Sequence, residues 1–243
     1  MNDTLIALLA LLLGLGCGKA KVDKKTENKV KTIHENTISL KTKAEKGDAR
    51  AQARLGFLYK KGQGVEKDLK EAAKWYRKAA EQNIVTAQNE LGSMYAHGEG
   101  VGKDLKESVK WYRKAAEQNA TTAQNNLGWM YQNGLGVDQD FVEAVKWYRT
   151  AAERGLVKGR YNLGVMYSKG EGVEKDLVAA YAWFHMAASG GDQNAKKDKE
   201  LIASEMTPDQ IAKANQLSDK LLKQNFTSRM NPPPPGAPSG SSP

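Results

Sequence analysis

The residue types that could do chemistry are few in this sequence, and its pattern does not gather them. The histidines are His34, His97 and His185. They occupy three different positions of the repeat described below, so a repeating fold would not bring them together to bind a metal. Paired glycines such as Gly62 and Gly64 lack the preceding strand and the Lys-Ser/Thr sequence of a phosphate-binding loop. No Gly-x-Ser-x-Gly element and no persuasive Ser/His/Asp set is present. The sequence therefore predicts no catalytic residue, no metal and no cofactor, and we expect that the protein is not an enzyme.

The only cysteine, Cys17, stands where a covalent modification is expected. It follows an unbroken apolar run, Leu5 to Leu13, which is too short for a membrane span of about 20 residues but has the length of a signal-peptide core. The junction Gly14-Leu15-Gly16-Cys17 is similar to the lipobox of bacterial lipoproteins, in which the cysteine is acylated. It departs from that pattern in having Gly14 where Leu is usual and no Lys or Arg before the apolar run.

We therefore expect a signal peptide over residues 1–16 and a lipid anchor on Cys17, which would hold the protein on a membrane of the bacterial cell envelope, facing the periplasm or the surface. There are two alternatives. Ordinary cleavage after Gly16 would leave a secreted protein with a free thiol at Cys17, and a signal that is never cut would keep the apolar run in place. With one cysteine the chain forms no internal disulfide, so its stability must come from a core of adequate size.

The elements that must carry any function are set by an internal repeat of 36 residues. Leu-Gly pairs, tyrosines, Gly-x-Gly turns and aspartates all recur at this step, as do four of the five tryptophans: Trp75, Trp111, Trp147 and Trp183. Such a period is the signature of a repeat architecture, in which each unit cannot bury its apolar face alone and the stacking of neighbours supplies the core. The repeated tryptophans are therefore predicted to be core residues.

Each repeat is predicted to contain two helices. The first covers roughly residues 51–61 and ends at Gly62, and the second begins after Asp68, an N-cap residue with Glu71 three positions later as in a capping box. The boundary between repeats is always Gly or Asn, the residues that enter the left-handed conformation most cheaply: Gly47, Asn83, Asn119, Gly155 and Gly191.

These signals divide the chain into segments. After the signal peptide we expect a flexible linker over 17–34, a partial repeat or cap over 35–50, repeats over 51–83, 84–119, 120–155 and 156–191, capping helices over 192–224, and a disordered Pro/Gly/Ser-rich tail over 225–243. Thr207 and Gln210 are expected to cap the last helix.

The block 87–101, followed by Asp104 and the segment Lys110 to Ala116, resembles a Sel1-like repeat, a relative of the tetratricopeptide repeat, and the resemblance covers roughly residues 44–192. It implies an all-α fold, a right-handed superhelical solenoid of two-helix repeats closed by a C-terminal capping helix, and adaptor-like protein binding. Some cysteine-rich exported relatives have been described as binding or hydrolysing β-lactams, but this chain lacks their repeated cysteine pairs.

The basic charge, +9 with a pI near 9.4, would permit acidic lipid or nucleic acid as a partner. However, lysines on the second helices, such as Lys74, lie three residues after a glutamate, here Glu71, and arginines such as Arg77 lie four residues before one, here Glu81. Such pairs neutralise each other on a helix surface. Since no ladder of exposed aromatic residues alternates with the cations, nucleic acid is not expected as a partner.

A protein or peptide partner is expected instead, on the concave face that the first helices of such a solenoid line. Binding should involve positions where the repeats differ, and the candidates are Phe57, Asn89, Asn125, Trp129 and Tyr161. Exposed tryptophan is a typical anchor of binding energy, and asparagine can hold a peptide backbone by donor and acceptor together. Alternatively, Trp129 fills a gap between repeats and the asparagines are merely solvated.

The function expected is that of a membrane-anchored adaptor. The alternative is an envelope ligand binder or hydrolase acting on β-lactam or peptidoglycan-type substrates.

Overall fold

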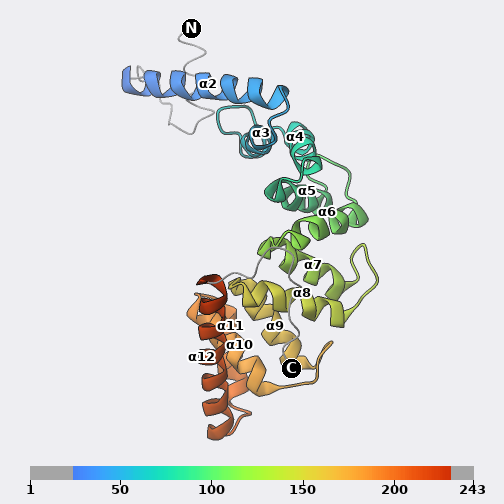
Figure 1. Cartoon of the computed structure of the whole chain (residues 1–243), viewed down its shortest axis with the longest axis vertical. Coiled ribbons are helices and arrows are strands. Elements are labelled where there is room, and N and C mark those ends of the chain that lie inside the picture. Colours follow the sequence, from blue (N-terminus) through green and yellow to red (C-terminus); the bar gives the residue numbers. More distant parts are fainter. Residues whose placement is uncertain (1–23, 231–243) are drawn as a thin grey trace. The chain divides into compact units, whose positions relative to one another are not determined.

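The computed structural model describes residues 24–230, and all regular structure in this range is helical, as predicted (Figure 1). The described residues divide into two compact units between Ala123 and Gln124, inside α7. The helices are α2 (Lys24–Glu45), α3 (Ala49–Lys61), α4 (Leu69–Glu81), α5 (Val85–His97), α6 (Leu105–Glu117), α7 (Thr121–Asn133), α8 (Phe141–Glu153), α9 (Val157–Lys169), α10 (Leu177–Ser189), α11 (Gln193–Ala203) and α12 (Pro208–Met230). None of these described helices is both long and apolar enough to cross a membrane. The expected signal peptide and Cys17 lie outside the described residues.

The second helix of each repeat begins at the predicted aspartate, but only half of the capping box forms. The carboxylate of Asp68 accepts hydrogen bonds from the backbone N–H groups of Lys70 and Glu71, at 2.8 and 3.0 Å. The backbone N–H of Asp68 donates to the carbonyl of Tyr59, so Glu71 cannot return the bond. Glu71 pairs with Lys74 instead, at 3.0 Å. A tertiary hydrogen bond has therefore replaced the local one.

The boundaries between repeats have the predicted left-handed backbone. Gly47, Asn83, Asn119, Gly155 and Gly191 all have φ between 62° and 97°. A side chain with a branched β-carbon would be strained in this region, which explains why only Gly and Asn occur there.

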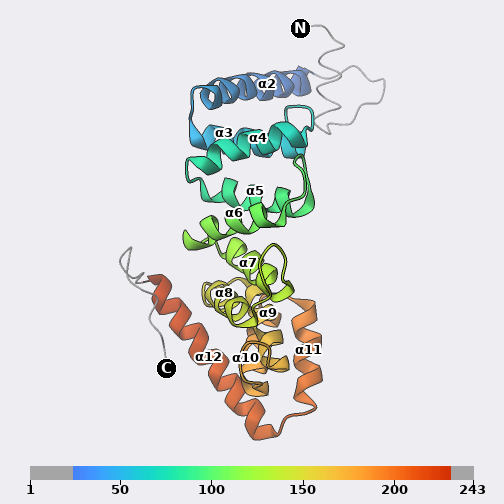
Figure 2. The same ribbon diagram turned by 90° about the vertical axis from the view of Figure 1, so that its right-hand side faces the viewer.

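Within the N-terminal unit, successive helices pack in chain order from α2 to α6 (Figure 2). Trp75 packs with Ala44, Ala51 and Leu55, and Trp111 lies in one core cluster with Leu91 of its own repeat and Ala80 of the preceding repeat. In the C-terminal unit Trp183 is buried in the same way, with Tyr148, Leu163 and Met166. Trp147 is only half-buried, so the prediction of a buried tryptophan is wrong for this copy.

α2 takes the place of the second helix of a preceding repeat. Gln52 donates its side-chain N–H to the carbonyl of Ala44 at 3.1 Å, as Gln88 does to Ala80 at 3.1 Å one repeat later. Ser39 stands where the repeats have tryptophan, so α2 lacks the large core residue of a complete repeat. The sequence predicted a flexible linker over 17–34, but residues 24–34 belong to α2.

α11 and α12 cover the other end of the repeat array, and both pack against α10. Their buried residues include Ala195, Ile202, Met206 and Ala214. Here the reciprocal capping box does form, since the N–H of Thr207 donates to the Gln210 side chain at 2.8 Å and the N–H of Gln210 donates to the Thr207 hydroxyl at 3.3 Å. α12 continues through residues 225–230, which the sequence had assigned to the disordered tail.

The closest approach between repeats is made by the second glycine of the Gly-x-Gly turn. A Cβ atom at Gly100 would overlap the backbone carbonyl of Leu69, and one at Gly172 would overlap that of Phe141. Both glycines also have positive φ, 69° and 71°. These turns therefore rest directly on the first turn of the preceding second helix.

Replacing Gly100 by Ala should lower the free energy of unfolding by roughly 2–4 kcal/mol, because the new methyl group meets backbone and the left-handed conformation is strained. Gly102→Ala is the matched control, because nothing lies within 4 Å of a Cβ at that position. Urea denaturation of both variants measures the difference. Equal stability of the two would show that this turn does not hold the repeats together.

Candidate functional site

The first helices of the N-terminal unit form a groove, which we call the N-terminal groove, with a volume of about 530 Å³ between α3 and α5. Its lining residues are Arg50, Ala53, Arg54, Phe57, Leu58, Gln63, Tyr76, Ile84, Thr86 and Glu90. Those on α3 recur at spacings of three and four residues, which places them on one face of the helix. The opposite face carries Ala51, Leu55 and Gly56 into the core.

Two aromatic side chains on first helices are exposed, one in each unit. Phe57 of α3 is 42% exposed and Trp129 of α7 is 48% exposed. They occupy the same position of the repeat, where the other copies have Ser93 and Val165. The residues just before and after Trp129, Gly128 and Met130, are buried, so the helix turns the indole outward. The structure thus places Trp129 at the surface, where the sequence had left open a gap-filling role.

Asn125 and Tyr161, also predicted to bind a partner, make bonds inside the C-terminal unit. Asn125 is only 3% exposed, and its side-chain oxygen accepts a hydrogen bond from Asn162 of α9 at 2.9 Å. The hydroxyl of Tyr161 donates to Asp198 of α11 at 3.0 Å. Burial and the charge of Asp198 raise the pKa of Tyr161 to about 12, so the hydroxyl keeps its proton and remains a donor. These bonds link successive first helices and leave little of either side chain for a partner.

Asn89, the remaining candidate, lies on α5 and is partly buried. Its side-chain oxygen is buried and has no hydrogen-bond partner among the described residues. The five candidates therefore do not form one surface: Phe57 and Trp129 are exposed aromatic positions in different units, whereas Asn125 and Tyr161 are engaged within the fold.

The N-terminal groove has an ion pair at its edge that the sequence analysis missed. Glu90 accepts a hydrogen bond from Lys60 at 3.0 Å, and Lys60 also lies 3.4 Å from Glu99. Burial alone would lower the pKa of Lys60, but the two carboxylates outweigh it and raise the pKa above its usual value. Burial and the charge of Glu90 raise the pKa of Tyr76 far above its ordinary range, so this phenol stays neutral. The pair joins residues 30 positions apart, a spacing that no helix pattern marks.

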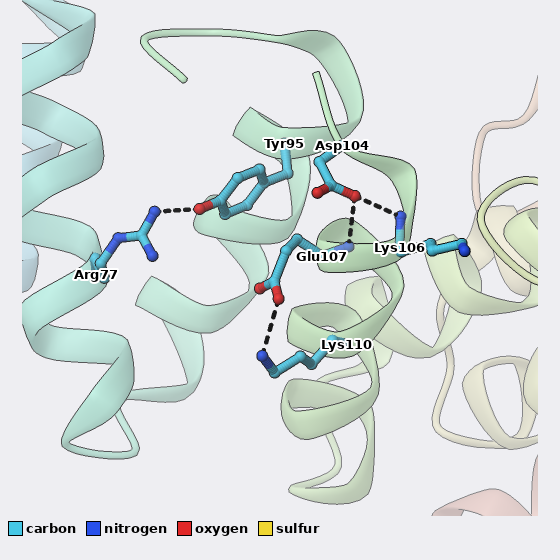
Figure 3. A network of polar contacts seen from close by, with 6 residues as sticks. All are labelled: Arg77, Tyr95, Asp104, Lys106, Glu107 and Lys110. Carbon is cyan, nitrogen blue, oxygen red and sulfur yellow. Dashed lines mark hydrogen bonds and ion pairs between the residues drawn. The ribbon is translucent and has the colours of Figure 1, made fainter. Parts of the chain in front are cut away.

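The second helices present a different surface, on which one row of lysines is paired with glutamates. Lys74, Lys110 and Lys146 each pair with the glutamate three residues before, as predicted. Figure 3 shows the pair of Glu107 and Lys110 below the Asp104 cap. Arg77 does not follow the predicted pattern: it donates to the hydroxyl of Tyr95 on the next helix, and Arg149 does the same to Tyr167 at 2.6 Å. These arginines therefore link neighbouring helices. In the described part of the chain, no group of three or more His, Cys, Asp or Glu side chains could hold a metal ion.

A repeat of two helices with a tryptophan core, an aspartate cap and glycine-mediated turns defines this chain as a helical repeat protein. The sequence matches the Sel1 repeat over residues 49–84, 85–119, 121–156 and 157–192, more than half of the chain, so the protein belongs to the Sel1 repeat family. This confirms the family and the repeat fold that the sequence indicated.

Two solved structures are similar over most of this chain. A Sel1 repeat protein from Oxalobacter formigenes is 36% identical, with a TM-score of 0.68, over 82% of each chain. The protein c5321 of uropathogenic Escherichia coli, described as a protective antigen with an SLR fold, is 30% identical with a TM-score of 0.72, over 99% of this chain and 51% of its own. A short stretch of 44 residues is 48% identical to the secretory immunoglobulin A-binding protein EsiB of Escherichia coli O6:H1. That stretch is 18% of this chain and 9% of EsiB.

Replacing Asn125 by Ala should lower the free energy of unfolding by about 1–2 kcal/mol, because it leaves the partly buried amide of Asn162 without its partner. A double-mutant cycle with Asn162→Ala measures the coupling by urea denaturation. Purely additive effects would mean that this bond does not hold α7 to α9.

Proposed function

We propose that this protein is an exported, membrane-anchored adaptor that binds a protein or peptide partner through the first helices of its Sel1 repeats. Repeat proteins of this kind offer an extended surface whose positions vary from copy to copy while the repeated residues form the core. An adaptor of this kind needs no catalytic group.

The observation that carries the proposal is the exposure of Phe57 and Trp129. The repeat uses nearly all of its other aromatic residues in the core or in bonds between helices. Leaving large apolar side chains in water at the same repeat position has a cost that a binding partner would remove. The second-helix surface offers no such residue pair and carries matched charges, which favour solvation.

The relatives support a binding role at the level of class. One of them is described as binding secretory immunoglobulin A, a protein ligand, although its likeness to this chain is confined to 44 residues. That is consistent with repeats of this family holding a protein, and it does not transfer the immunoglobulin to this chain.

Export and anchoring rest on the sequence alone. The apolar run, the small residues before Cys17 and the absence of other cysteines agree with a lipoprotein of the cell envelope. An anchor at Cys17 would stand at the same end of the chain as α2 and the N-terminal groove.

Phe57→Ala and Trp129→Ala should each reduce recovery of the native partner by about tenfold or more, because truncating an anchoring aromatic side chain removes its buried contact. The measurement is proximity capture from intact envelopes followed by quantitative mass spectrometry. Val142→Ala is the matched control, since Val142 is also an exposed apolar residue but lies on a second helix, α8. Thermal melting must be unchanged in all three variants. Identical capture by all variants would contradict binding on the first helices.

Cys17→Ser should move the protein from the membrane fraction to the soluble fraction of the envelope and abolish incorporation of labelled palmitate, because the acceptor thiol is lost. Fractionation and metabolic labelling of cells producing the full chain measure both effects. If the wild-type protein takes up no label and is soluble, the anchor is absent and the protein is secreted.

A further inference from the structure

The N-terminal groove is open because of one small residue. Position 53 of the first repeat is Ala, whereas the equivalent positions are Asn89, Asn125 and Tyr161. In the C-terminal unit, Asn125 and Tyr161 reach across to the next first helix and bond to Asn162 and Asp198. The methyl group of Ala53 is too short to reach its opposite residue, so the space that a longer side chain would cross is left as part of the groove of about 530 Å³.

The walls of this space are suited to an apolar side chain. Ala53, Leu58 and Ile84 supply aliphatic surface, and Phe57 stands exposed at its side. Tyr76 adds a neutral phenol. Because the groove is open and its walls are largely apolar, it suits a side chain of an extended peptide.

The groove carries an excess of positive charge. Arg50 and Arg54 are exposed, lie one helical turn apart and make no ion pair within the described part of the chain. The one carboxylate in the lining, Glu90, is already neutralised by Lys60 at 3.0 Å.

The basic surface continues into a neighbouring cavity of about 740 Å³ between α2 and α3. Arg54, Leu58 and Gln63 line both spaces, so the two are contiguous. The second cavity adds Lys43 and has no acidic lining residue. An extended chain lying across α2, α3 and α5 would therefore meet apolar surface flanked by unpaired cations.

We propose that the N-terminal groove binds an acidic peptide segment of the partner, with an apolar side chain in the space beside Ala53 and flanking carboxylates on Arg50 and Arg54. Arginine pairs with carboxylates in a two-pronged geometry, which suits this role. This inference rests on the proposed adaptor function and specifies its partner. A nucleic acid fits less well, because the apolar walls of the groove do not match a phosphate backbone.

The test uses the full chain and short fluorescein-labelled peptides with a common central Leu-Phe-Leu. Their flanks are Asp-Glu-Asp, Ser-Gln-Ser or Lys-Lys-Lys, and fluorescence anisotropy measures the dissociation constants. The acidic peptide should bind about tenfold or more tightly than the neutral one, the basic peptide should bind most weakly, and added salt should reduce the preference. Equal affinity for the three peptides, or no binding of the acidic one at millimolar concentration, overturns the proposal. So does tighter binding of a labelled oligodeoxythymidine than of the acidic peptide.

Two variants locate the site. Ala53→Tyr introduces the residue that the fourth repeat has at this position and should fill the space, weakening the acidic peptide by about tenfold or more. Arg54→Glu changes only an exposed side chain and should weaken it by at least about fivefold. Lys106→Glu, an equal change of charge at an exposed residue on α6, is the control and should bind as the wild type does. Wild-type affinity in both groove variants refutes the assignment, and thermal melting verifies that each variant is folded.

The outcomes separate this inference from the adaptor function. If the acidic peptide fails to bind but Phe57→Ala still loses the native partner from envelopes, the adaptor function stands and the acidic occupant is wrong. If the peptide binds and depends on Ala53 and Arg54, while envelope capture is the same for wild type and every first-helix variant, the groove is an acidic-peptide site but not the adaptor surface.

Discussion

The contact on which the repeat stack depends is the one between the Gly-x-Gly turn of one repeat and the backbone at the start of the preceding second helix. At Gly100 and Gly172 there is no room for even a β-carbon, since the carbonyls of Leu69 and Phe141 occupy that place. The distance between these repeats is therefore set by a contact between two backbone segments, and the core side chains pack within that distance. The first repeat makes the corresponding contact with α2. Gly64 lies against the side chains of Ile33 and Thr37 of α2, where Gly100 lies against helix backbone, so α2 acts as a cap for the first repeat.

Once this spacing is fixed, neighbouring repeats within each unit present the same positions to one another, which is why much of the fold could be predicted from the sequence. The period, the buried tryptophans at 75, 111 and 183, the aspartate caps and the left-handed boundaries all follow from residues that recur. The failures have a common cause. Glu71 could not complete its capping box because the Asp68 N–H bonds to Tyr59, and Arg77 bonds to Tyr95 beyond its own helix. Both competing bonds are tertiary, and helix spacing alone does not contain them.

The candidate site, too, could be predicted from the sequence only in part. Phe57 and Trp129 could be found from the sequence because a large apolar residue on the outer face of a helix has no core to enter. Asn125 and Tyr161 looked equally variable, but each faces a residue 37 positions later on the next first helix and bonds to it. The gap beside Ala53 was invisible for this reason, since a small residue reveals a cavity only when the residue opposite is known.

A longer polar residue at position 53 would add a bond between first helices, as Asn125 does in the third repeat, and would close the groove. The first repeat lacks that bond, and α3 and α5 are instead joined at the edge of the groove by Lys60 and Glu90. Lys60 also lies within ion-pair distance of Glu99, so this one partly buried lysine pairs with two carboxylates. No side chain of α3 crosses the middle of the groove to α5. The contact that joins α3 to α5 therefore lies at the edge of the groove and not at its centre. The apolar surface of the groove and its two arginines without an ion pair remain accessible. The missing bond alone does not distinguish the first repeat, because the side-chain oxygen of Asn89 in the second repeat also has no partner among the described residues. What distinguishes the first repeat is that Ala53 leaves apolar surface open beside two arginines without an ion pair, and this is the physical argument that the first repeat is suited to hold a ligand.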